Sequence, residues 1–198
     1  MPRRLAPLLL PLLPPLACSS PAGGRRSVLD EILEAGNYDR VLQDPHVLVN
    51  VSFVFSRIGP LHAQSFRVDV HFVQRWHDKR LVWNPAERHG LKQLSLTHED
   101  DINRFWTPDT SFRYATNFEK RDLQSLVVSS DGVLAWRQHF LMTLRCLTQL
   151  RAFPFDRQRC QINFGSESQP MHVLDYMWDP SPIDLPSGSW EFVDYYMV

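Results

Sequence analysis

The chain has 198 residues and a net charge of −1, from 21 Lys and Arg against 22 Asp and Glu. These charges form no long run of one sign, so the sequence offers no electrostatic basis for binding nucleic acid or an anionic membrane surface. The length without a predicted leader, about 175 residues, suits one domain with a sizeable core.

The first 20 residues have the layout of a secretory signal peptide. Two arginines near the start precede an apolar stretch, residues 5–17, and small residues follow it. The stretch is shorter than the roughly 20 apolar residues that cross a bilayer, and prolines interrupt it. Cleavage is expected near Ala17, and residues 21–26 are predicted to be a polar linker. A lipoprotein signal at Cys18 is a weaker alternative, because Pro15 stands where that signal has an aliphatic residue.

Residues 27–35 are predicted to form a helix. Ser27 is a candidate N-cap, with Asp30 three positions later in place of the usual Glu, and Gly36 ends the pattern. Four apolar residues lie on one face at helical spacing: Val28, Leu29, Ile32 and Leu33.

From residue 47 the apolar period changes to two, which predicts strands with one buried face. Residues 47–55 and 66–76 alternate in this way, with Gly59-Pro60 as the turn between them. Further short strands are expected at residues 81–83, 91–96, 112–118, 123–128, 133–145, 157–164, 172–178 and 190–198. Asp131-Gly132 between two apolar runs predicts a hairpin. One N-terminal helix followed by about ten short strands predicts an all-β, immunoglobulin-like β-sandwich over residues 27–198.

Cys146 and Cys160 enclose thirteen residues and are the only cysteine pair outside the leader. In a secreted chain they are expected to form a disulfide, which the chain-entropy model values at about 3 kcal/mol. In a cytosolic protein two unrelated buried thiols would be the better interpretation. The loop carries an aromatic-proline-aromatic-acid sequence at its centre, residues 153–156.

The sequence contains no catalytic motif, since it lacks a phosphate-binding loop and a serine nucleophile elbow. Neither Cys146 nor Cys160 lies at metal-ligand spacing from a histidine. We therefore predict no enzyme activity, no cofactor and no metal, although a zinc site assembled across strands would be invisible in sequence.

Asn50-Val51-Ser52 is a glycosylation sequon inside an expected strand. The motif Trp106-Thr-Pro108-Asp109 places a bulky ring before a turn, where the ring can anchor the turn and the carboxylate can cap amides.

Together these motifs resemble the extracellular ligand-binding domain of a Cys-loop receptor, a subunit of a pentameric ligand-gated ion channel. The resemblance rests on the cysteine spacing with Phe-Pro-x-Asp inside it and on the Trp-x-Pro-Asp motif. Residues 69–84 resemble the second strand of GABA- and glycine-gated subunits, residues 131–136 the hairpin before the cysteine loop, and Phe164-Gly165-Ser166 the segment that follows it. The similarity extends from about Ser27 to Val198.

The resemblance implies a small neurotransmitter-like ligand bound between homologous subunits of a pentamer. The principal-face candidates are Ser111, Arg113, Tyr114 and Glu167, and the complementary-face candidates are His71, Val73 and Arg137. Glu167 stands where acetylcholine and serotonin sites hold an ammonium against an aromatic ring. It would either pair with a cation by charge or leave the site without such a ligand. Arg137 offers a partner for a carboxylate, and the agonist stays open.

The resemblance also assigns coupling and structural roles. Coupling to the pore is expected from the first turn, with Ile58, Pro60 and Leu61, and from the cysteine loop, with Phe153, Pro154, Phe155 and Asp156. Structural roles are expected for Trp76, Trp106, Pro108 and Asp109.

The resemblance leaves the end of the chain open, because Val198 falls inside the expected ninth strand. The final strand and the membrane helices of the family would follow it in a longer parent. We therefore expect a channel subunit or a fragment of one, on the secretory pathway and at the extracellular face of the plasma membrane. The alternative is a secreted ligand-binding or dominant-negative assembly-competitor form without a pore. An unrelated secreted β-sandwich enzyme is the third and weakest interpretation.

Overall fold

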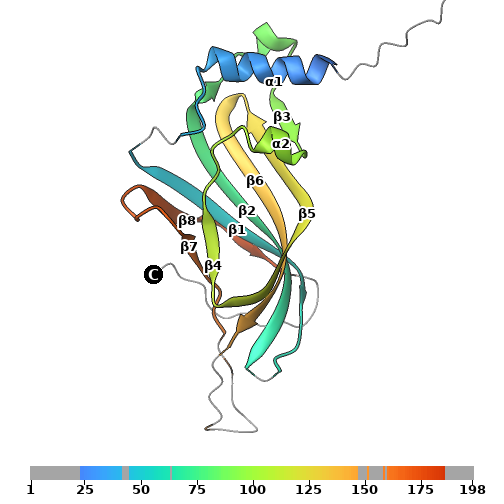
Figure 1. The fold of residues 1–198 in the computed structure, drawn as a ribbon, viewed down its shortest axis with the longest axis vertical. Coiled ribbons are helices and arrows are strands. Elements are labelled where there is room, and N and C mark those ends of the chain that lie inside the picture. The colour runs from blue at the N-terminus through green and yellow to red at the C-terminus, as the bar shows by residue number, and fades with distance from the viewer. Residues whose placement is uncertain are drawn as a thin grey trace, which may run out of the picture.

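The computed structural model describes residues 23–41, 45–62, 64–146, 151, 158 and 160–185. Their strands form a six-stranded sheet in the order β3-β5-β6-β2-β1-β8 and a two-stranded sheet of β4 and β7 (Figure 1). The elements are α1 (Gly23–Ala35), β1 (Val47–Ile58), β2 (Ser65–Val82), the 3₁₀ helix η1 (Pro85–Arg88), β3 (Gln93–Leu96), α2 (Glu99–Ile102), β4 (Thr110–Arg113), β5 (Ala115–Ser129), β6 (Asp131–Arg145), β7 (Asn163–Ser166) and β8 (Leu174–Asp184). The predicted all-β, immunoglobulin-like sandwich with an N-terminal helix is confirmed.

The long strand β2 organises the larger sheet. It pairs antiparallel with β1 on one side and with β6 on the other, whereas β8 pairs parallel with β1 at the sheet edge. From Phe66 to Trp76, the even-numbered side chains of β2 point into the sandwich, as Phe72 shows by its ring contacts with Phe112 of β4 and Phe164 of β7 at 5.3 and 5.6 Å. Because side chains alternate along a strand, His71 and Val73 lie on the opposite side. We call this side, turned away from β4 and β7, the outer face.

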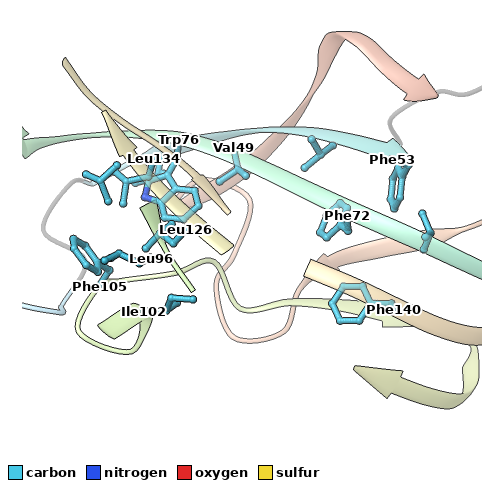
Figure 2. Close-up of a cluster of buried hydrophobic side chains, with 14 of the residues drawn as sticks. Val49, Phe53, Phe72, Trp76, Leu96, Ile102, Phe105, Leu126, Leu134 and Phe140 are labelled. Atoms are coloured by element: carbon cyan, nitrogen blue, oxygen red, sulfur yellow. The ribbon is translucent and has the colours of Figure 1, made fainter. Parts of the chain in front are cut away.

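Two groups of apolar side chains fill the interior. Figure 2 shows one group around Trp76, with Leu96, Ile102, Phe105, Leu126 and Leu134, and a second group with Phe53, Phe72 and Phe140. Every one of these side chains is at most 6% exposed. Burial of each stabilises the fold by roughly 1.5–3 kcal/mol, so the two groups supply much of the stabilising free energy.

Helix α1 packs its predicted apolar stripe onto one end of the sandwich, with Leu29 and Ile32 at 2% and 3% exposure. The chain then passes close to β2 at Gly36, where an added Cβ would lie 2.1 Å from the carbonyl oxygen of Arg80. Beyond it, the Tyr38 hydroxyl accepts a 2.8 Å hydrogen bond from the backbone N–H of Trp106. The guanidinium of Arg80 covers the Tyr38 ring at 4.4 Å, so helix, β2 and the Trp-x-Pro-Asp segment meet here.

Several element boundaries differ from the sequence predictions. Helix α1 begins at Gly23 rather than Ser27, so the last four residues of the predicted linker are helical. The strands expected at 66–76 and 81–83 are one strand, β2, because sheet pairing extends across the irregular register near its end. The strand expected at 112–118 is divided at Tyr114, whose φ of 61° turns the chain from β4 into β5.

At the opposite edge, β8 runs through Asp179-Pro180, although an Asp-Pro pair is typical of a turn. Proline is tolerated there because β8 is an edge strand with a bulge between Trp178 and Ile183. The predicted turn at Gly59-Pro60 and the hairpin at Asp131-Gly132 are confirmed between β1 and β2 and between β5 and β6.

Some predictions fall on residues outside the described ranges. These are the signal peptide at 1–20, the cysteine-loop centre at 153–156 and the strand expected at 190–198. Within the described ranges, none of the helices is both long enough and apolar enough to span a membrane.

Candidate functional site

Strand pairing brings the complementary-face candidates together on the outer face. Val73 of β2 lies directly opposite Arg137 of β6, and His71 lies opposite His139. Val73 is 7% exposed but is not part of the apolar core, and Arg137 is exposed. Within the described ranges the guanidinium of Arg137 makes no hydrogen bond or ion pair, so it is available to an anionic group.

Val73 and Arg137 border an open groove of about 780 Å³ that crosses the outer face, and His71 is not among its lining residues. Strands β5, β6, β2 and β1 form its floor, and the bulged part of β8 forms one wall through Asp179, Pro180 and Ser181. The second arginine of the groove, Arg75, pairs with Asp179 and also donates to Ser52 Oγ at 3.4 Å. The two arginines therefore differ, since the charge of Arg75 is compensated within the chain and that of Arg137 is not.

His71 lies at the end of this set in a small cluster of titratable groups. Its ring stacks on that of His139 with centroids 4.4 Å apart, and His139 Nε2 contacts Asp69 Oδ1 at 2.5 Å. Burial lowers the pKa of His71, and the neighbouring His139 and Arg137 lower it further against the opposing effect of Asp69. The neutral imidazole is therefore the favoured form of His71 near neutral pH.

The principal-face candidates lie on the other sheet. Ser111 of β4 pairs with Gly165 of β7, and Arg113 pairs with Asn163. Since Phe112 points into the core, Ser111 and Arg113 point away from it. Tyr114 is 70% exposed at the corner that follows β4.

Glu167 is positioned by the aspartate of the Trp-x-Pro-Asp motif. Its backbone N–H donates to the Asp109 carbonyl at 3.3 Å, and its side chain is exposed. The Asp109 carboxylate accepts Ser166 Oγ at 2.5 Å on one oxygen, and the backbone N–H and hydroxyl of Ser168 at 2.7 and 2.5 Å on the other. We call this arrangement the Asp109 clamp, and it holds the segment that presents Glu167 against the start of β4.

The ionisation of Asp109 reflects the clamp. Burial acts to raise the pKa of this carboxyl, but the hydrogen bonds from Ser166 and Ser168 together outweigh burial and hold the pKa below its ordinary value. The remaining motif residues fix the turn itself. Trp106 packs edge-on against Trp76 with ring centroids 5.8 Å apart, and Pro108 is buried.

The predicted disulfide is confirmed, with Cys146 and Cys160 joined and their Cα atoms 4.8 Å apart. It ties the end of β6 to the segment that precedes β7. The backbone N–H of Cys146 donates to the Gln64 carbonyl at 2.8 Å, so the bridge also adjoins the connection from β1 to β2. At the end of β1, Ile58 is buried, and in the connection Leu61 is partly buried and Pro60 is exposed.

The sequence assigned no functional role to several residues that shape these surfaces: Gln74, Thr110, His139, Ser166, Ser168 and Tyr176. A polar Gln74 at an inward position of an alternating strand was the one sequence signal that pointed to any of them.

The sequon residue Asn50 lies on β1 opposite Arg75, and its Oδ1 is buried without a hydrogen-bond partner in the described part of the chain. Among the described residues, no group of three or more His, Cys, Asp or Glu is placed to hold a metal ion.

A two-sheet sandwich with a helical cap and a disulfide defines the chain as a β-sandwich domain. The family model for the neurotransmitter-gated ion-channel ligand binding domain matches residues 26–197. The chain therefore belongs to this family.

Individual relatives agree with this assignment. The chain is 29% identical over 169 residues to gamma-aminobutyric acid receptor subunit gamma-4 of Gallus gallus, covering 80% of the chain and 35% of the relative. It is 24% identical over 179 residues to gamma-aminobutyric acid receptor subunit epsilon of Rattus norvegicus, covering 85% of the chain and 34% of the relative. It is also 24% identical over 196 residues to acetylcholine receptor subunit alpha-type acr-5 of Caenorhabditis elegans, covering 88% and 32%. The chain thus spans about one third of the length of these relatives.

Proposed function

We propose that this chain is the extracellular ligand-binding part of a neurotransmitter-gated channel subunit. It binds a small ligand between adjacent homologous subunits of a pentamer and transmits binding to a pore through the disulfide loop. The secretory leader at residues 1–20 would deliver it to the extracellular face of the plasma membrane, and Asn50 is its candidate glycosylation site.

The placement of the two candidate sets carries this proposal. His71, Val73 and Arg137 lie on the outer face of the larger sheet, whereas Ser111 and Arg113 lie on the far side of the smaller sheet. The apolar core separates the two sets, so one chain has no means of closing both around the same small ligand. Two neighbouring chains, each contributing one set, satisfy this geometry.

The charges of the two sets favour a class of ligand. Arg137 offers an uncompensated guanidinium, and Glu167 presents an exposed carboxylate next to the Asp109 clamp. A guanidinium binds a carboxylate in a bidentate manner, and a carboxylate binds an ammonium group. The names of the relatives cited above, which mention gamma-aminobutyric acid and acetylcholine, are consistent with small ligands that carry a cationic amine, a carboxylate or both.

The position of the disulfide supports the coupling role. The Cys146 amide donates a hydrogen bond to the connection between β1 and β2. A movement of the disulfide therefore reaches that connection through this bond, and a movement of the connection reaches the disulfide. Substitution of Pro60 or Leu61 is expected to impair channel gating more than ligand affinity. Phe153, Pro154, Phe155 and Asp156 lie outside the described residues and stay predicted coupling residues on the family resemblance.

Recordings from oocytes that express a full-length subunit containing this domain would test the proposal, with small amines and amino acids applied as agonists. Arg137→Gln and Glu167→Gln are each expected to raise the half-maximal concentration about tenfold or more, because each removes a charge-assisted interaction. Lys79→Gln and Glu34→Gln are matched controls, because both side chains are exposed and lie outside the candidate sets. Unchanged responses in both test variants would contradict the assigned site.

The secreted alternative makes a different prediction. A ligand sink or assembly competitor without a pore would lower the current of a co-expressed related subunit and carry none itself. Co-expression of this chain with such a subunit distinguishes the two functions.

A further inference from the structure

A chain of polar side chains crosses the otherwise apolar interior between the two sheets. Thr110 Oγ1 donates to Gln74 Oε1 at 2.5 Å and lies 2.7 Å from Tyr176 Oη, and Gln74 Nε2 donates to Gln138 Oε1 at 3.3 Å. Because the Thr110 hydroxyl has one proton and gives it to Gln74, the Tyr176 hydroxyl must donate to Thr110. All three hydrogen bonds then run in one direction, which strengthens each of them. We call these four side chains the core relay.

The core relay lies where the two apolar groups of the interior separate. Gln74 is 0% exposed and occupies the inward position of β2 between Phe72 and Trp76, which belong to different groups in Figure 2. Gln138 is 7% exposed on the neighbouring strand. Buried amides add less to stability than well-packed apolar side chains of the same size, so hydrophobic burial alone does not account for them here.

The core relay joins the two candidate sets within one chain. Gln74 and Gln138 directly follow Val73 and Arg137, so their side chains point inward beneath the outer-face pair. At the other end, Thr110 lies between Asp109 and Ser111. The Asp109 clamp extends the connection to Ser166 and Ser168 on either side of Glu167.

We propose that Thr110 is a positioning residue that couples the two candidate sets of a single chain through the core relay. A shift of β2 and β6 at Val73 and Arg137 moves Gln74 and Gln138, and Thr110 passes the shift to the segment that presents Glu167. The functional meaning of this coupling rests on the proposed function, because each subunit of a ring then contributes to two sites and occupancy of one alters its neighbour. The coupling itself is a property of the single chain.

The test needs no ligand, so its outcome is independent of whether the proposed function holds. Backbone amide chemical shifts of the secreted, isotope-labelled chain are compared between wild type and Val73→Ala, a perturbation confined to the outer face. We expect the amide signals of Ser166, Glu167 and Ser168 to move. In a Thr110→Val background, the same perturbation should move them by less than about half as much, as in a double-mutant cycle between coupled sites.

Two further variants separate coupling from mere support of the fold. Thr110→Ser retains the hydroxyl and should restore the full response, whereas Tyr176→Phe should weaken it and serves in place of Thr110→Val if that variant does not fold. Thr116→Val, the same chemical change at an exposed site on β5, should leave the response unchanged. The proposal is overturned if the wild-type signals at 166–168 do not move, or if they move equally after loss of the Thr110 hydroxyl.

Discussion

The two candidate surfaces are built in different ways. On the outer face, backbone pairing between β2 and β6 places Val73 opposite Arg137, and each of these strands is long. On the smaller sheet, two four-residue strands carry the surface, and the Asp109 carboxylate accepts three hydrogen bonds that hold the Glu167 segment. A surface built from a long ladder tolerates the loss of one side chain better than a surface held by one carboxylate. Mutations and pH should therefore affect the two surfaces unequally.

The largest effect on stability is expected from the disulfide, because it links the end of β6, which carries Arg137, to the segment that precedes β7. Cys146→Ser with Cys160→Ser should lower the free energy of unfolding by about 3 kcal/mol. Denaturant titration of both proteins measures this difference. Equal midpoints with unchanged slopes would show that the bridge does not stabilise the domain.

The Asp109 clamp should give the next largest effect. Asp109→Asn replaces an acceptor of three hydrogen bonds. We expect it to lower the free energy of unfolding by about 2 kcal/mol at neutral pH. The folded-state pKa lies below the ordinary carboxyl value of 3.8, so the stabilisation is complete above that value and disappears as the pH falls through the folded pKa.

Denaturation at pH 7 and in acid tests this pH dependence. The difference between wild type and Asp109→Asn should shrink in acid. Asp100→Asn, on the exposed side of α2, is the control and should change stability little. A constant difference across the pH range would contradict the clamp as the origin of the effect.

On the outer face, the pH dependence of stability should be smaller than that from Asp109, and it should come from His71. Its folded-state pKa is below the ordinary value of 6.5, so protonation opposes folding, and stability should decline as the pH falls from 6.5 through the folded pKa. His71→Gln should flatten this part of the stability profile, whereas exposed His172→Gln should not. A profile that is identical in all three proteins would exclude His71 as its source.

The ionisation of Tyr176 should have the smallest effect on stability at physiological pH. Burial raises its pKa to about 12. Stability from the neutral phenol is complete below the ordinary pKa of 10 and is lost as the pH rises through about 12. Absorbance of tyrosinate should show a late-ionising group that Tyr176→Phe removes, and its persistence in that variant would disprove the assignment.

The sequence predicted features that depend on local pattern. The alternation at 47–55 and 66–76 predicted β1 and most of β2, and the turn residues at 59–60 and 131–132 predicted the two hairpin connections. Boundaries were wrong where tertiary contacts outweighed local preference, as in the extension of β2 to Val82 and of β8 through Pro180. The candidate residues were chosen by resemblance, and the sheet register shows that they form two sets on different sheets.

Periodicity, turn chemistry and the spacing of two cysteines are local properties, and from them the all-β sandwich, its helical cap and its disulfide follow without any knowledge of the fold. The core relay and the Asp109 clamp are different. Thr110 meets Gln74 and Tyr176 across 36 and 66 residues, and Asp109 meets Ser166 and Ser168 across 57 and 59. No local pattern encodes such pairs, because hydrogen bonds between distant side chains exist only after hydrophobic burial has brought the two sheets into register.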